Sequence, residues 1–134
     1  MGKIIVNFDG SCGPKNPGGQ IGYACIIKDS DENFIFRDSQ KEEASPENTN
    51  NVAEYKALIL ALSWLLCNGY MNKCIEVIGD SKLVINQMSG EWRAKSGSYY
   101  DQYLEAQRLA ANFTNIRFLW VPRSKNAEVD AISR

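Results

Sequence analysis

Four acidic residues, far apart in the sequence, lie where carboxylates could meet in the folded chain: Asp9, Glu54, Asp80 and Asp130. Asp9 follows an alternating apolar segment, 4–8, and Asp80 follows a second apolar segment, 74–79. Glu54 and Asp130 each fall in the first turns of a predicted helix. Four carboxylates brought together would repel one another and have raised pKa values, so divalent metal is the natural partner of such a cluster.

The other possible ligands indicate which metal this would be. The chain has no histidine, and its four cysteines show no C-x-x-C spacing. These two observations exclude the usual zinc sets. Oxygen ligands alone favour Mg²⁺ or Mn²⁺.

Three of the four acids also have a structural alternative. Asp80 precedes a helix and could be its N-cap. Asn51 with Glu54 three residues later fits a capping box, and Asp130 near a helix start suits the helix dipole. Taken singly, Glu54 and Asp130 are better explained in this way. The joint pattern of four acids favours the metal site.

Hydrophobic periodicity predicts the elements that position these acids. Segment 4–9 alternates with period two, whereas 51–69 has apolar residues at three- and four-residue steps and ends at Gly69. The order of elements is βββαβααβα. The predicted strands span 4–9, 20–29, 33–40, 74–80 and 115–122, and the predicted helices span 51–69, 81–88, 98–113 and 126–134.

This order predicts an α/β fold with a five-stranded mixed sheet and helices on both faces. Right-handed crossovers make the first, fourth and fifth strands parallel neighbours, with an antiparallel meander at one edge. Sites in such sheets lie at the carboxyl ends of the parallel strands. Because Asp9 ends the first predicted strand and Asp80 the fourth, we expect them at the same edge.

Length and composition limit the remaining possibilities. The 134 residues, 44% hydrophobic, suit a single domain, 1–134. The net charge of −1 gives no sign of a nucleic-acid or membrane partner. No apolar stretch reaches the ~20 residues of a membrane span. Cysteines of this kind are typical of reduced thiols, so we expect a cytoplasmic protein. No obligate protein partner is evident, and we expect a monomer.

Four segments, in their order and spacing, resemble the type 1 ribonucleases H: FDGSCGPKNPGG, NTNNVAEYKALILAL, GDSKLVINQMSGEW and WVPRSKNAEVDAIS. The resemblance covers nearly the whole chain and implies a ribonuclease H-like fold. It also implies endonucleolytic, metal-dependent hydrolysis of the RNA strand of RNA/DNA hybrids, which leaves 3′-hydroxyl and 5′-phosphate ends. The catalytic and metal-binding residues would be Asp9, Glu54, Asp80 and Asp130.

The resemblance assigns roles within this set. Asp9 would bridge two Mg²⁺ ions, for which Mn²⁺ could substitute. Glu54 and Asp80 would help to hold one ion, and Asp130 would position the other. Two ions of this kind suit an in-line phosphoryl displacement.

Hybrid selectivity requires groups that detect 2′-hydroxyls on one strand only. The resemblance places RNA contacts in the loop 11–16 and at Asn50 and Asn51, a DNA phosphate at Thr49, and the DNA strand beside Trp92. Alternatives are a surface turn for 49–51 and a half-buried core edge for Trp92. The full set of expected substrate contacts is Gly10, Ser11, Cys12, Gly13, Asn16, Thr49, Asn50, Asn51, Ser81, Asn86, Trp92, Arg123 and Asn126.

The chain departs from the family in three places. It lacks the lysine-rich protrusion between the two middle helices, so we expect weak, salt-dependent hybrid binding. It lacks the loop histidine before the last acid, where Arg123 or Lys125 could substitute electrostatically. Asp130 lies in a short final helix, which we expect to fray.

Other functions fit less well. A phosphatase with an aspartyl nucleophile would need a second acid at position 11, which is Ser11, and a sugar kinase would need far more chain. No Lys-Ser or Lys-Thr pair follows the glycines, which excludes a P-loop. The remaining alternative is a catalytically silent hybrid-binding module of the same fold.

Overall fold

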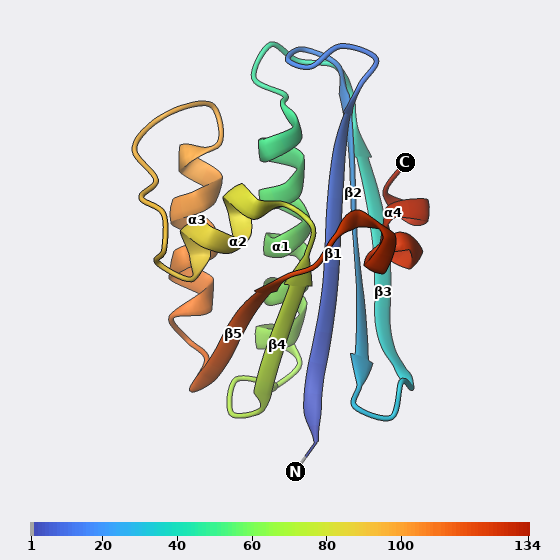
Figure 1. Ribbon diagram of the computed structural model, residues 1–134, viewed down its shortest axis with the longest axis vertical. Coiled ribbons are helices and arrows are strands. Elements are labelled where there is room, and N and C mark those ends of the chain that lie inside the picture. The colour runs from blue at the N-terminus through green and yellow to red at the C-terminus, as the bar shows by residue number, and fades with distance from the viewer. Residues whose placement is uncertain (1) are drawn as a thin grey trace.

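The computed structural model describes residues 2–134, which form one five-stranded sheet with helices on both faces (Figure 1). The sheet order is β3-β2-β1-β4-β5. The strands are β1 (Lys3–Gly13), β2 (Gln20–Asp29), β3 (Phe34–Glu42), β4 (Cys74–Gly79) and β5 (Asn115–Trp120). The helices are α1 (Asn50–Cys67), α2 (Lys82–Met88), α3 (Tyr100–Ala110) and α4 (Ala127–Ser133), with a 3-10 turn at Arg123–Lys125.

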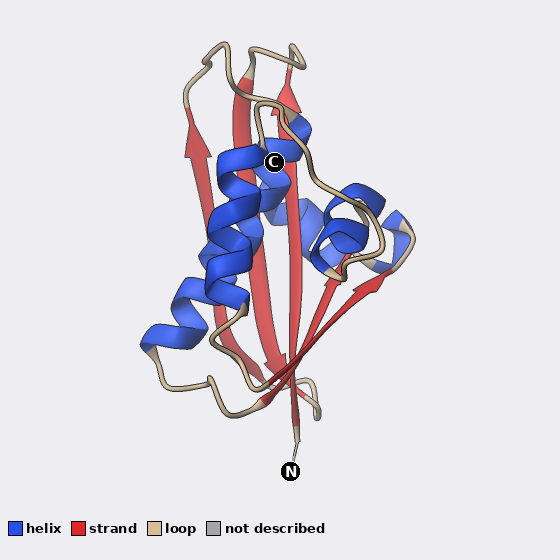
Figure 2. Cartoon of the chain, turned by 90° about the vertical axis from the view of Figure 1, so that its left-hand side faces the viewer, coloured by secondary structure: helices blue, strands red, loops and turns tan. Residues whose placement is uncertain are grey.

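The predicted topology is confirmed. β1 runs antiparallel to β2 and parallel to β4, and β4 runs parallel to β5. The sheet is twisted, so β4 and β5 cross the direction of the other strands at an angle (Figure 2). β3 and β5 form its two edges.

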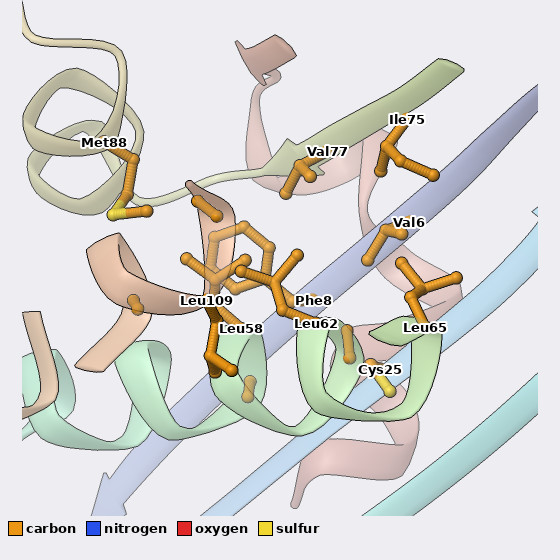
Figure 3. Packing of buried hydrophobic residues seen from close by; sticks show 14 of the residues in the cluster. Val6, Phe8, Cys25, Leu58, Leu62, Leu65, Ile75, Val77, Met88 and Leu109 are labelled. Carbon is orange, nitrogen blue, oxygen red and sulfur yellow. The ribbon is translucent and has the colours of Figure 1, made fainter. Parts of the chain in front are cut away.

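The hydrophobic core lies between the sheet and α1. Val6 and Phe8 on β1 are fully buried against Leu58 and Leu62 of α1, as Figure 3 shows. α2 and α3 complete this layer, whereas α4 packs on the opposite face through Val129, which contacts Ala24 and Ile26 of β2. Among residues 2–134, no helix combines the length and apolar character needed to cross a membrane.

One predicted boundary is wrong in a way that affects the site. Asp9 does not end its strand, because β1 continues to Gly13. The continuation is held by β2, with Asp9 opposite Ala24 and Gly13 opposite Gln20. The parallel pairing with β4 stops earlier, at Asn7. Asp9 therefore lies beyond the end of β4 but within an antiparallel ribbon, which fixes its direction.

The helix starts also differ from the prediction. Thr49 is the N-cap of α1, and its hydroxyl accepts a hydrogen bond from the Val52 amide. Ser81 is the N-cap of α2 and accepts from the Val84 amide. The structural alternatives of an N-cap at Asp80 and a capping box of Asn51 with Glu54 are therefore excluded. The two acids are free for other contacts.

Candidate active site

Three carboxylates converge beyond the end of β4. Asp9 from β1, Glu54 from the first turns of α1 and Asp80 after β4 each offer an oxygen within 4.8 Å of the others. We call these three residues the inner acids. Asp9 and Glu54 are buried, and Asp80 is partly exposed. With Asp130, they line a pocket of ≈ 160 Å³.

Gly10 brings β1 and α1 close enough for this arrangement. A Cβ at Gly10 would lie 2.3 Å from the carbonyl carbon of Ala53, so no other residue fits without moving the helix. The Gly10 amide donates a hydrogen bond to Oε1 of Glu54, at 3.2 Å. This contact holds Glu54 beside Asp9.

The main chain and side chain of Asp80 are held separately. Trp120 Nε1 donates to the Asp80 carbonyl at 3.0 Å, and the Val121 amide donates to the carbonyl of Gly79. Asn126 Nδ2 donates to Oδ2 of Asp80 at 3.3 Å. The carboxylate is thereby oriented from the start of α4.

Asn126 is buried within a small polar network that the sequence did not reveal. Its Nδ2 also donates to the Phe8 carbonyl at 3.0 Å, and its Oδ1 accepts from Asn7 Nδ2 at 2.9 Å. Asn7 and Phe8 thus favour the amide orientation in which Asn126 donates to Asp80. Asn126 is only 2% exposed, and its side chain positions the Asp80 carboxylate; its expected contact with substrate stays a prediction.

Asp130 has a different environment from the inner acids. Arg123 Nη2 lies 3.4 Å from its Oδ1, and Arg134 Nη2 lies 3.2 Å from its Oδ2. Ser133 connects it to Asp9, because the Ser133 hydroxyl lies 2.9 Å from the Asp130 carbonyl and 3.3 Å from Oδ2 of Asp9.

The surroundings raise the pKa values of Asp9 and Glu54 and lower that of Asp130. Burial, a hydrogen bond with Asp130 and the charge of Asp80 raise the pKa of Asp9 to about 7. Burial, followed by the charges of Asp9 and Asp80, raises the pKa of Glu54 well above its ordinary value. The hydrogen bond with Asp9, together with Arg134 and Arg123, lowers the pKa of Asp130.

The donor set fits a divalent cation. Within residues 2–134, no lysine or arginine forms an ion pair with any of the inner acids. Three carboxylate oxygens that are close together and lack a positive partner are suitable ligands for Mg²⁺ or Mn²⁺. Asp130 has partners of its own and lies at the rim of the same pocket.

Several expected substrate contacts surround this pocket. Gly10, Ser11, Asn50 and Arg123 line it. Two hydrogen bonds tie the end of β1 and the loop after it to the start of α1. The Cys12 amide donates to Asn50 Oδ1 at 3.0 Å, and the Asn50 amide donates to Asn16 Oδ1 at 3.2 Å.

The other expected contacts lie outside the pocket. The hydroxyls of Thr49 and Ser81 cap helices, although Thr49 also lies 3.5 Å from Ser98 Oγ. Trp92 is 47% exposed, so it is not a half-buried core edge. Gly13 lines a neighbouring pocket, and Asn51 and Asn86 are half-buried on α1 and α2.

The comparisons with known proteins agree with this architecture. A model of the family described as "Reverse transcriptase-like" matches residues 7–134. The chain belongs to this family. Its structure is similar to the N-terminal RNase H domain of Rv2228c from Mycobacterium tuberculosis, with a TM-score of 0.87 and 33% identity over 99% of this chain and 91% of that one. The resemblance to ribonuclease H is thus confirmed, and the chain is a ribonuclease H-like domain.

Two further relatives are similar over most of this domain. Ribonuclease HI of Halobacterium salinarum is 30% identical over 98% of this chain and 63% of its own length. LC11-RNase H1, solved in complex with an RNA/DNA hybrid, has a TM-score of 0.84 and 31% identity over 96% of this chain and 92% of that one. The bifunctional protein Rv2228c is 35% identical over 98% of this chain, which spans only 34% of that relative's length.

Proposed function

We propose that residues 1–134 form a single ribonuclease H domain that hydrolyses the RNA strand of RNA/DNA hybrids endonucleolytically. The products would carry 3′-hydroxyl and 5′-phosphate ends. The convergence of the inner acids, which lack a positive partner among the described residues, is the main support. The printed names of the similar proteins, a ribonuclease HI and an RNase H1 in complex with a hybrid, agree with this substrate.

The chain's carboxylates provide the ligands for this reaction. Asp9 faces both the other inner acids and Asp130, so it would bridge two ions. Glu54 and Asp80 would hold one ion and Asp130 would position the other. Bound Mg²⁺, or Mn²⁺ in its place, would supply a Lewis acid and lower the pKa of a water for in-line attack on phosphorus.

Other residues would position the hybrid. Ser11 and Asn50 line the acidic pocket and would contact RNA sugars. Arg123 also lines it, and its side chain, 67% exposed, would meet a phosphate. Thr49 and Trp92 would contact the DNA strand. We also propose that the domain acts as a monomer and that it lies in the cytoplasm. The four free cysteines agree with a reducing compartment.

A second candidate is a hybrid-binding module without turnover. The inner acids disfavour it, because three adjacent carboxylates would repel the phosphates of a bound strand unless a cation neutralises them.

The test is cleavage of a labelled RNA/DNA hybrid by the purified chain in Mg²⁺, Mn²⁺ or EDTA, beside Asp9→Asn and Asp80→Asn variants. We expect cleavage that requires the metal and is lost in both variants. Binding without metal-dependent cleavage would support the silent module instead. Equal cleavage by the variants would overturn the assignment of the acids.

A further inference from the structure

A second, basic pocket adjoins the acidic one on the face of the sheet that carries α4. Its volume is ≈ 170 Å³, and its polar and charged lining comes from Ser11, Gln20, Lys41, Ser133 and Arg134. Ser11 lines both pockets. Figure 1 shows the C-terminal end of α4 beside β2 and β3, and residues of these three elements line the pocket.

The strand register explains why these residues meet. Ser11 on β1 lies opposite Gly22 on β2, which lies opposite Lys41 on β3. Directly paired residues share one face of a sheet, and so do residues two apart along a strand. Ser11, Gly22 and Lys41 therefore form a row that lies on the same face of the sheet as Asp9. Ser11 is two residues further along β1 than Asp9.

Gly22 allows the last turn of α4 to close the pocket. A Cβ at Gly22 would lie 2.0 Å from the carbonyl oxygen of Ser133, so the helix end packs directly on the bare backbone of β2. This contact brings Ser133 and Arg134 to the row. The pocket is thus built by four separate segments of the chain rather than by one loop.

The charged residues that line the pocket are both basic. They are Lys41 and Arg134, and none of the described acidic residues lines the pocket. Lys41 is exposed and forms no ion pair with the acids of residues 2–134. Arg134 contacts Asp130 through Nη2 alone, which leaves its other N–H groups free to donate. A lysine, an arginine and the Ser11 hydroxyl form a donor set that suits a phosphate.

We propose that this pocket binds a backbone phosphate of the RNA strand, next to the phosphate that is cleaved. This inference rests on the proposed function. The cleaved strand has to lie on the acidic pocket, and the shared Ser11 makes the basic pocket its direct continuation. Such a contact would supply positive charge locally in a chain whose net charge is −1 and which lacks a lysine-rich protrusion.

The test asks whether Lys41 contacts one particular phosphate of the RNA strand. Hybrids in which a neutral methylphosphonate replaces one RNA phosphate at a time are titrated against the Asp9→Asn protein in EDTA, which prevents cleavage. At one position next to the cut, we expect the substitution to weaken binding about 3- to 10-fold. The additional change Lys41→Ala should weaken binding to the unmodified hybrid by a similar factor. It should also lower, by about 1, the slope of the logarithm of the binding constant against the logarithm of the salt concentration. In this variant, the methylphosphonate at that position should no longer weaken binding.

Lys73→Ala is the matched control, because Lys73 is exposed in the turn before β4, at the far end of the sheet. It should leave the sensitive position unchanged, and Lys41→Arg should restore it. If Lys41→Ala binds every hybrid like its parent, the pocket assignment is wrong while the proposed function stands. If the Asp9→Asn protein and the wild type bind no hybrid at all, the proposed function itself fails.

A second arm separates the strand from free phosphate. Inorganic phosphate is added to the labelled protein while the amide resonances of Gly22 and Lys41 are followed. We expect weak shifts that an unmodified hybrid displaces. The proposal would be overturned if inorganic phosphate shifted these resonances but no methylphosphonate position depended on Lys41. The pocket would then bind a free anion.

Discussion

Asp9 and Asp130 lie in the same small pocket, yet their carboxylates have opposite surroundings. Asp9 is 4% exposed and faces Glu54 and Asp80, whereas Asp130 lies at the rim between two arginines. The pKa of Asp9 is raised and that of Asp130 is lowered. The inner acids therefore have no positive partner among residues 2–134, whereas Asp130 has a hydrogen bond with Asp9 and two arginines beside it.

The largest difference should appear in the rate of cleavage. We expect Glu54→Gln to lower the rate in Mg²⁺ by about 10³-fold, because it removes one of three charges that have no positive partner. Asp130→Asn should lower it by only about 10-fold, since two arginines already offset the charge of Asp130. Single-turnover cleavage of a labelled hybrid measures both rates. Equal losses would contradict the distinction between the inner acids and Asp130.

The packing that holds the inner acids can be tested at Gly10. Gly10→Ala would place a methyl group 2.3 Å from the Ala53 carbonyl carbon, so we expect it to lower the free energy of unfolding by about 3 kcal/mol. Urea denaturation measures this loss. Gly13→Ala is the matched control, because a Cβ there meets nothing within 4 Å. If both variants were equally stable, the packing of β1 against α1 would not require a glycine at position 10.

The pH dependence of stability should separate Asp9 from Asp130. Because the pKa of Asp9 is about 7 in the fold against an ordinary value of 3.8, its stabilising contribution is complete below about pH 4 and is lost as the pH rises through about 7. For Asp130, whose pKa is lowered, the contribution is present above its ordinary pKa and is lost as the pH falls through its folded pKa.

In EDTA at about pH 8, Asp9→Asn should therefore raise the free energy of unfolding by about 1–3 kcal/mol. Asp130→Asn should lower it, and Mg²⁺ should reduce the advantage of Asp9→Asn. Urea titrations with and without the metal measure these differences. If the metal-free wild type were more stable than Asp9→Asn at this pH, the charged Asp9 carboxylate would not destabilise the fold, which would contradict this prediction.

The smallest effect concerns the network behind Asp80. Asn7→Ala removes the donor to Asn126 Oδ1, so we expect a loss of about 1 kcal/mol in unfolding free energy and a weaker affinity for Mg²⁺. Calorimetric titration with Mg²⁺ measures the second effect. Asn7→Asp, which cannot donate, should behave like Asn7→Ala. Unchanged metal affinity in both would leave Asn7 with a purely structural role.

The fold could be predicted because its signals are local and strong. The apolar face of residues 4–8, the three- and four-residue steps of α1 and the stop at Gly69, whose φ is +82°, are all visible in the sequence. The extension of β1 to Gly13 was missed because Gly10 and Gly13 are poor strand formers. Pairing with β2 makes this segment a strand, and that pairing is a tertiary effect.

The site could be predicted only in part. The approach of Asp9 and Asp80 follows from the parallel neighbours β1 and β4, but the roles of the four acids stay predictions. The contacts of Asn7 and Ser133 gave no sequence signal beyond the period of two that places Asn7 on the same face as Asp9. Helix caps depend on the backbone conformation of one residue, so Thr49 and Ser81 could not be distinguished from their polar neighbours.

The central claim is that the inner acids bind a divalent cation. A Mn²⁺ titration of the isotope-labelled chain, followed by paramagnetic broadening of its amide resonances, tests this most directly. Broadening should begin at Gly10, Glu54 and Asp80, should be reversed by excess Mg²⁺ and should be absent in Asp9→Asn. Broadening that begins elsewhere, or that persists unchanged in Asp9→Asn, would contradict the account.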